Sequence, residues 1–174
     1  MLKLFESFKG TKVLSLRVGG LIGYALEPII NPNNLHIEGW YVEDSQSKEI
    51  LILLSQDIRD ILPQGIAVDD HEVLSDPDDL VRLKDILELD FHLTGMKVQS
   101  VSGKHFGKVT DYAFETTSFY VQKIYATQAI VRNLSGGNIS VDRSQSIEIT
   151  NKRIVIDDAT EKAKKPLIAP SPAG

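Results

Sequence analysis

One stretch of the sequence occurs twice. The segment SQDIRDILPQGIAVDD, at residues 55–70, returns as SQSIEITNKRIVIDD at residues 144–158. The similarity extends upstream, because GTKVLSLRVGGLIG at residues 10–23 resembles GMKVQSVSGKHFG at residues 95–107. A period of about 85 residues is too long for a solenoid repeat or a propeller blade. The sequence therefore predicts a tandem duplication of one small domain.

Apolar residues follow a period of two within each copy. The run from Leu35 to Trp40 shows this period in the first copy, and the run from Phe119 to Ile124 shows it in the second. Alternation of β-branched and aromatic residues with polar ones predicts half-buried strands. A small sheet of short strands buries its inner face by curling shut, so each copy is predicted to be a small closed β-barrel.

The segment SDPDDLVRLKDILELDF between the copies carries helix signals. Asp76 is a good N-cap, and Pro77 suits the first helical position. We therefore predict a helix over residues 77–89 whose apolar stripe docks on the neighbouring barrels. The stripe consists of Leu80, Leu83, Ile86 and Leu87.

The alignment of the copies also predicts equivalent core positions. The predicted core positions of the first copy are Val13, Ile22, Ile58, Ile66 and Val68, and they should match, in this order, Val98, Phe106, Ile147, Ile154 and Ile156 of the second copy. The C-terminal segment has three prolines and no periodicity, which predicts disorder. The resulting division is a first barrel at residues 1–75, a connecting helix and linker at 76–92, a second barrel at 93–158 and a disordered tail at 159–174.

Composition excludes several kinds of site. The chain has no Cys, which rules out disulfides, thiolate metal sites and a cysteine nucleophile. The net charge of −5 argues against a nucleic-acid footprint over the whole molecule. Residues 10–70 contain four basic and nine acidic side chains, residues 71–94 contain two and seven, and residues 95–158 contain eight and six. An anionic partner should therefore prefer the second copy.

The N-terminal segment MLKLFESFKG is too short and too charged for a signal peptide or a membrane span. We therefore expect a cytoplasmic protein without a membrane span. The apolar residues of this segment either cap the first barrel or lie on lipid, and capping is favoured because lipid-binding helices are longer and more basic. These residues are Leu2, Leu4, Phe5 and Phe8.

With its residues laid out in this way, the chain resembles the PRC-barrel superfamily. These small β-barrels are known from the cytoplasmic domain of the photosynthetic reaction-centre H subunit and from the C-terminal domain of the ribosome maturation factor RimM. The resemblance rests on the opening Gly-x-x-Val, on the turn G-x-x-[IF]-G that ends at Gly23 and again at Gly107, and on the closing strands that end in Asp-Asp. It implies an interaction module that docks onto protein partners and is not catalytic. The sequence lacks the N-terminal translation-factor-like domain of RimM and the membrane helix of the H subunit, so neither specific role is carried over.

The sequence offers few catalytic candidates. Ser55 and Ser144 each precede Gln in the repeated SQ, but no G-x-S-x-G elbow accompanies them, and a turn role explains both. The acidic segment at residues 69–79 either binds a hard cation or forms a solvated helix start, and it lacks the spacing of a calcium loop. The histidines lack metal-ligand spacing, so we predict no catalytic, cofactor or metal site. They are His36, His71, His92 and His105.

Three functions remain, and the least favoured is a hydrolase that uses the acidic segment at residues 69–79. The favoured one is a non-enzymatic adaptor that binds protein partners. The alternative is an RNA- or ribosome-associated maturation accessory, because the basic residues of the second copy are interleaved with aromatic ones, as in single-stranded RNA platforms. Those aromatics are Tyr112, Phe119, Tyr120 and Tyr125. The net charge makes nucleic-acid binding at physiological salt unexpected. The candidate partner-binding residues are Trp40, Tyr41, Lys104, Lys108, Tyr125 and Arg132.

Overall fold

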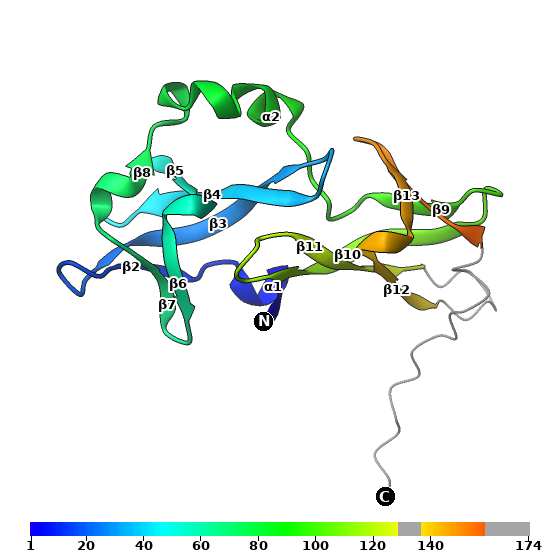
Figure 1. Cartoon of the computed structure of the whole chain (residues 1–174), viewed down its shortest axis with the longest axis horizontal. Coiled ribbons are helices and arrows are strands. Elements are labelled where there is room, and N and C mark those ends of the chain that lie inside the picture. Colours follow the sequence, from blue (N-terminus) through cyan, green and yellow to red (C-terminus); the bar gives the residue numbers. More distant parts are fainter. Residues whose placement is uncertain (129–136, 159–174) are drawn as a thin grey trace, which may run out of the picture. The chain divides into compact units, whose positions relative to one another are not determined.

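The computed structural model describes residues 1–128 and 137–158 (Figure 1). The protein is mainly β, with two mixed sheets and one short helix, α2 (Lys84–Leu89), between them in the chain. Unit 1 comprises Met1–Phe91 and Phe114–Val121, and unit 2 comprises His92–Ala113 and Gln122–Gly174. The segment Phe114–Val121, which the sequence places in the second domain, thus belongs to unit 1. The predicted disordered tail lies outside the described residues.

Seven strands form the sheet of unit 1. Their order is β6-β7-β2-β3-β4-β5-β8, and they run from blue to green in Figure 1. Neighbouring strands are antiparallel except β2 and β7, which are parallel. The bounds are β2 Lys12–Ser15, β3 Leu21–Asn31, β4 His36–Asp44, β5 Ile50–Leu54, β6 Ile58–Leu62, β7 Gly65–Val68 and β8 Leu74–Ser75.

The second sheet repeats this plan. Its order is β12-β11-β10-β9-β14-β13, and β1 also pairs with β10. Strands β9 and β14 are parallel, whereas the pairs β9–β10, β11–β12 and β13–β14 are antiparallel. The bounds are β1 Leu2–Leu4, β9 Lys97–Ser100, β10 His105–Glu115, β11 Val121–Thr127, β12 Asn138–Asp142, β13 Ser146–Ile149 and β14 Arg153–Ile156.

The two copies share one strand register. Val13 of β2 lies opposite Ile66 of β7, and Val98 of β9 lies opposite Ile154 of β14. All four side chains are fully buried. The predicted equivalence is therefore confirmed for these two pairs and for buried Val68 and Ile156, which have the same register. It is only partly confirmed for the other two pairs: Ile22 is buried, Phe106 and Ile58 are half-buried, and the side chain of Ile147 lies outside the described part of the structure.

Closure of each sheet into a barrel would require its two end strands to pair. Among the described residues, no hydrogen-bonded pair joins the end strands β6 and β8 of the first sheet or β12 and β13 of the second. The prediction of two β domains is confirmed as two mixed sheets, and the strand pairing does not show closed barrels.

Equivalent serines of the two copies close the turns that follow β2 and β9. Ser15 N–H donates to the carbonyl oxygen of Gly20 at 2.9 Å, and Ser100 N–H donates to that of Lys104 at 2.8 Å. Each buried hydroxyl oxygen also accepts a backbone N–H from its turn at 3.2 Å. The repeated serine is therefore a turn-forming residue.

The closing Asp-Asp of each copy holds this turn. Ser15 Oγ donates to Asp70 Oδ1 at 3.1 Å in unit 1. In unit 2 the link runs through Ser102, whose hydroxyl lies 2.9 Å from Ser100 Oγ and donates to Asp158 Oδ1 at 2.9 Å. The repeated carboxylates have a structural role that accounts for their recurrence.

The N-terminal segment packs onto unit 1. Helix α1 (Phe5–Phe8) buries both of its phenylalanines, whereas Leu2 and Leu4 are exposed. Capping of the first domain is therefore confirmed for Phe5 and Phe8, and the lipid-binding alternative is wrong for these two side chains.

An aromatic layer from the β10–β11 turn completes the core of unit 1. The ring centroids of Phe114 and Phe119 lie 5.8 and 5.6 Å from that of Trp40, which is fully buried. The Trp40 ring also lies 5.2 Å from that of Phe8. Clustered rings at these distances stabilise a core beyond the area they bury.

The tips of the two long hairpins pair with each other. Leu35 and Phe119 occupy equivalent positions of the two copies, and both have a left-handed backbone, with φ of 58° and 57°. Ile37 N–H donates to the carbonyl oxygen of Phe119 at 2.8 Å, and Val121 N–H donates to that of Leu35 at 2.9 Å. This reciprocal pair of hydrogen bonds fixes the β10–β11 tip in unit 1.

The connecting segment differs from the continuous helix predicted for residues 77–89. Two 3₁₀ turns, Pro77–Asp79 and Val81–Leu83, precede α2. Leu80 breaks the helix with φ −93° and ψ 70°, in a stretch where Asp and Val are weak helix formers. The uninterrupted helix is therefore wrong.

The predicted apolar stripe of this segment is confirmed in part, on unit 1. Leu83 is buried against Ile29 of β3 and Ile52 of β5, with an exposed fraction of 7%. Leu80, Ile86 and Leu87 pack around this cluster and are half-buried. The connecting segment is thus part of the fold of unit 1.

Candidate functional site

A groove of about 630 Å³ lies between the connecting segment and the strands β4 and β5 of unit 1. All of its lining comes from unit 1. Strand β4 contributes His36 and Glu38, and the turn after β5 contributes residues 54–56. The connecting segment contributes residues 79–83 and Ile86.

The connecting segment makes one wall of the groove apolar. Leu80 and Ile86 are half-buried, and Val81 is 79% exposed. Leu54 at the end of β5 adds a further half-buried aliphatic side chain. An aliphatic side chain that entered the groove would remove this surface from water, which is favourable.

The β4 wall is polar and held in place. Glu38 accepts a hydrogen bond from Asn31 Nδ2 at 3.3 Å, and His36 Nδ1 lies 3.2 Å from its second carboxylate oxygen. The His36 ring packs edge-on against Tyr120 at a centroid distance of 4.8 Å. A carboxylate has about four acceptor positions, so Glu38 retains capacity for a further donor.

The groove lies in an acidic part of the chain. Residues 71–94 contain two basic and seven acidic side chains, and exposed Asp79 lines the groove beside Arg82. The electrostatic field at the groove therefore favours a positively charged occupant.

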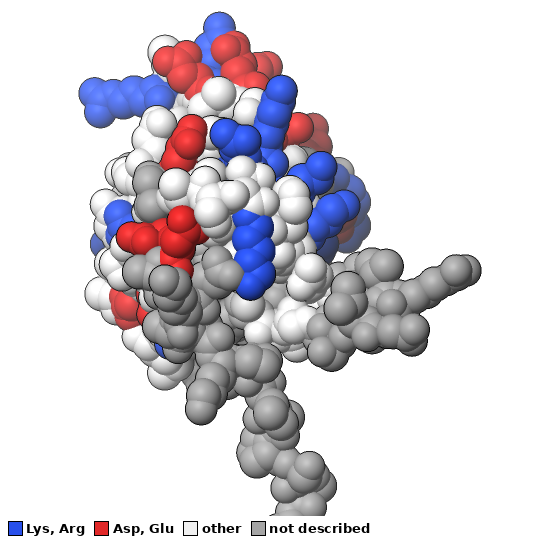
Figure 2. Space-filling model, turned by 90° about the vertical axis from the view of Figure 1, so that its right-hand side faces the viewer, with Lys and Arg blue, Asp and Glu red and all other residues white. Residues whose placement is uncertain are grey.

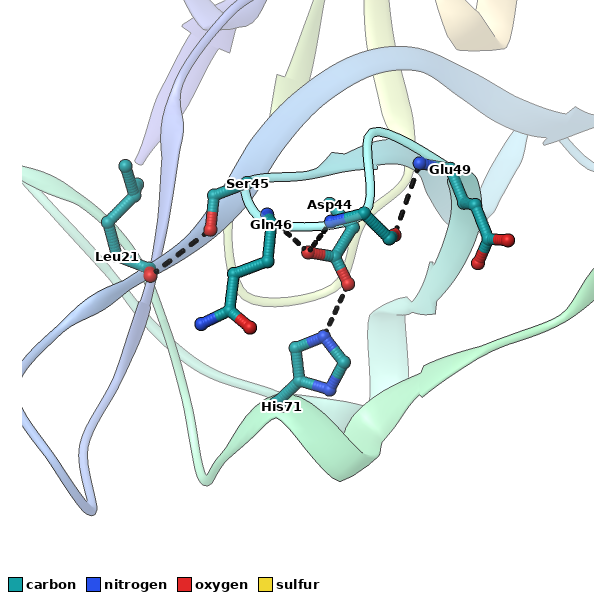
Figure 3. A network of polar contacts seen from close by, with 7 residues as sticks. Leu21, Asp44, Ser45, Gln46, Glu49 and His71 are labelled. Atoms are coloured by element: carbon teal, nitrogen blue, oxygen red, sulfur yellow. Dashed lines mark hydrogen bonds and ion pairs between the residues drawn. The ribbon is translucent and has the colours of Figure 1, made fainter.

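The Asp44–His71 pair is the nearest approach to a catalytic arrangement (Figure 3). His71 Nε2 lies 2.5 Å from Asp44 Oδ2, and the carboxylate is buried while the imidazole is half exposed. A carboxylate that orients a histidine is one part of a nucleophilic triad. The other residues labelled in Figure 3 are Leu21, Ser45, Gln46 and Glu49. Of these only Ser45 has a hydroxyl, and it donates to the carbonyl oxygen of Leu21 at 3.5 Å and not to the imidazole.

Asp44 instead shapes the β4–β5 turn. Its Oδ1 accepts the backbone N–H of Gln46 at 2.8 Å and that of Ser47 at 3.4 Å. The N–H of Gln46, followed by the bond from His71, lowers the pKa of the Asp44 carboxyl below its ordinary value. The pair ties this turn to the 3₁₀ turn that contains His71 (His71–Val73), which is a structural role.

The repeated serines also have structural roles. Ser55 is buried and donates its hydroxyl to the carbonyl oxygen of Ile37 at 2.6 Å. Ser144 lies in the 3₁₀ turn Arg143–Gln145, equivalent to the turn Ser55–Asp57. Both serines thus lie in turns between strands, as predicted, but the Ser55 hydroxyl bonds to strand β4 and not to its own turn.

The acidic segment at residues 69–79 is engaged in local contacts. Asp69 forms two hydrogen bonds with Arg59, at 2.9 and 2.6 Å, and Asp76 accepts the backbone N–H of Asp78 at 2.9 Å. Within the described ranges 1–128 and 137–158, no three His, Asp or Glu side chains are grouped as metal ligands.

The described members of the six predicted partner-binding residues are divided between the two units. Trp40 is fully buried and presents no surface, and Tyr41 is half-buried in unit 1. Tyr125 is half-buried in unit 2, where Lys104 and Lys108 are exposed. Arg132 lies outside the described residues.

Sequence reasoning missed the groove. Its only direct signals are Val81, an apolar residue off the stripe of the connecting segment, and the run of acidic residues beside it. The position of Glu38 opposite this segment follows from the folding of β4, which no local pattern reveals.

In the part of the chain that the structure describes, no helix is long and apolar enough to cross a membrane. Comparison with known proteins adds no relative: no protein-family model matches the chain, and no curated protein matches it.

Proposed function

We propose that this chain is a non-enzymatic adaptor built from two PRC-barrel-type modules, and that the groove of unit 1 binds a short segment of a protein partner. The groove carries the proposal, because it combines an exposed aliphatic wall with a fixed carboxylate.

The resemblance to PRC-barrels supports the choice of an interaction module. It rests on glycines and aliphatic residues of both copies, and the shared register of β2–β7 and β9–β14 is what a duplicated domain of this kind would have. Closure of each sheet into a barrel belongs to the same proposal.

The lining of the groove indicates the chemistry of the partner. An aliphatic side chain would pack on Leu80 and Val81, and a Lys or Arg would meet Glu38 and Asp79. Burial of one aliphatic side chain stabilises a complex by about 1.5–3 kcal/mol. Even with one charge pair this is below the roughly 8 kcal/mol of a micromolar complex, so a short basic and aliphatic segment should bind with an affinity nearer to millimolar.

The test uses an array of synthetic peptides in which one aliphatic and one basic position are varied independently. Peptides with Leu or Ile next to Lys or Arg should bind, and Val81→Asp should abolish their binding. Leu89→Asp is the matched control, because Leu89 is 50% exposed on α2 and does not line the groove. Binding that is unaffected by Val81→Asp, or an array without any binding peptide, would refute the proposal.

The RNA-associated alternative has less support. Two of the aromatic residues on which it depends, Tyr112 and Phe119, are buried, with exposed fractions of 2% and 9%. Base stacking requires exposed rings. Three basic residues of unit 2, Lys97, Lys108 and Arg153, nevertheless lie side by side on adjacent strands.

A further inference from the structure

Three basic side chains lie in register across adjacent strands of unit 2. Lys97 of β9 lies opposite Lys108 of β10 in an antiparallel pair and opposite Arg153 of β14 in a parallel pair. All three side chains are exposed. Neighbouring strands are about 4.8 Å apart, so the three backbone positions span about 10 Å. We call these residues the basic row.

The basic row is unfavourable for the sheet itself. Like charges directly opposite each other on paired strands destabilise the pairing. Among the described residues, no acidic side chain forms an ion pair with Lys97, Lys108 or Arg153. The repulsion within the row is therefore not offset by a neighbouring carboxylate.

The first copy provides an internal comparison. Lys12 takes the place of Lys97, and its strand partner on β3 is Tyr24. Gly65 precedes Ile66 on β7, just as Arg153 precedes Ile154 on β14. The same sheet plan thus forms with one basic residue in this row, so the two additional cations of unit 2 are not needed for folding.

Two further exposed lysines lie close to the row in the sequence. Lys104 lies over the Phe106 ring at 5.4 Å from its centroid, and exposed Lys152 directly precedes Arg153. Figure 2 shows one side of the molecule, on which Lys and Arg side chains lie among uncharged and acidic ones. A carboxylate brought to such a surface would meet several donors.

We propose that the basic row binds an acidic segment of a protein, separate from the segment that the groove of unit 1 takes. This inference rests on the proposed adaptor function. It makes the two modules complementary in charge: the groove takes a basic segment and the row an acidic one. The duplicated domain would then bridge two partners.

The number of cations favours an acidic polypeptide over a nucleic acid. Strong nucleic-acid binders contact about 6–10 phosphates, whereas the row offers three cations. Arg153 can form a bidentate pair with one carboxylate, which gives geometric specificity to a small site. The burial of Tyr112 and Phe119 removes two rings that bases would need for stacking.

The experiment measures fluorescence anisotropy with three labelled probes at low salt and at physiological salt. The probes are a peptide of alternating Glu and Gly, a single-stranded RNA of similar length, and vesicles with one third anionic lipid. The peptide should bind best. The double variant Lys97→Gln/Lys108→Gln should weaken peptide binding about 5–10-fold, as expected for the loss of two exposed charge pairs.

The matched control is Lys12→Gln/Lys84→Gln, which removes the same charge from unit 1 and should leave peptide binding unchanged. The row variant should also melt at or above the wild-type temperature, because it relieves repulsion. Val81→Asp should not affect this peptide, so failure at the row and failure at the groove are distinguishable.

Three results would overturn the inference. RNA binding that is tighter than peptide binding and depends on the row would assign the row to nucleic acid. Vesicle binding that depends on the row would assign it to a membrane surface. Equal peptide binding by the row variant and its control would show that the row is not a binding site.

Discussion

Replacing Leu83 with alanine tests whether the connecting segment is part of the fold of unit 1. The Leu83 side chain is 7% exposed and packs against Ile29 and Ile52. Removal of its buried methyl groups loses transfer free energy and leaves a cavity, which costs about 2–5 kcal/mol for Leu→Ala in protein cores.

The expected loss lies near the lower end of this range. Leu80, Ile86 and Leu87 border the cluster and are half-buried, so they can move into part of the space. We expect Leu83→Ala to lower the free energy of unfolding by about 2–3 kcal/mol. For a unit of this size the melting temperature should fall by about 10 °C.

Trp40 reports on this unit directly. It is the only tryptophan of the chain and is fully buried in unit 1. Urea unfolding followed by its fluorescence therefore measures the stability of unit 1. Leu89→Ala is the control, because Leu89 ends α2 in the same connecting segment and is 50% exposed, and its effect should stay within about 0.5 kcal/mol.

Two variants with equal unfolding free energies would refute the packing argument. The connecting segment would then be a tether that contributes nothing to unit 1, and the groove beside it would not be a fixed site.

Two further predictions concern the turns and the acid stability. Gly107→Ala should destabilise the protein more than Gly103→Ala in thermal melts: both have φ near +90°, but only at Gly107 would a Cβ meet a backbone oxygen, that of Thr127, at 2.1 Å. Equal effects would mean that the strands do not approach closely there. The pKa of Asp44 is lowered in the folded state, so its stabilising contribution is present above the ordinary value of 3.8 and is lost as the pH falls below it. Asp44→Asn keeps an oxygen for the N–H of Gln46 but cannot titrate. The free energy of unfolding of this variant should therefore fall less than that of the wild type as the pH is lowered through 3.8, and an equal fall in both proteins would contradict this role.

The duplication was predictable because its signal is local and repeated. The positions of Val13 and Val98 follow from aligned strands with the same alternation, and the folded register matches. The stripe of the connecting segment was predictable for the same reason. The break at Leu80 was not, because it depends on how the segment lies on β3 and β5.

The candidate surfaces depend on tertiary structure. Period-two alternation predicts that Phe119 points inward, but not that it packs on Trp40 of unit 1. The basic row likewise cannot be predicted from the net charge of the second copy. Lys97 and Arg153 are far apart in sequence and become neighbours only through the parallel pairing of β9 and β14. Local patterns therefore predict the strands better than the surfaces that the strands create.

The central claim is that the groove of unit 1 binds a short aliphatic and basic segment. Its most direct test is an NMR chemical-shift map of the ¹⁵N-labelled chain, titrated with the best-binding peptide of the array. We predict that the shifts concentrate at residues 36–38, 54–56 and 79–86, and that Val81→Asp removes them. Shifts that concentrate in unit 2, or that persist unchanged in Val81→Asp, would contradict the account.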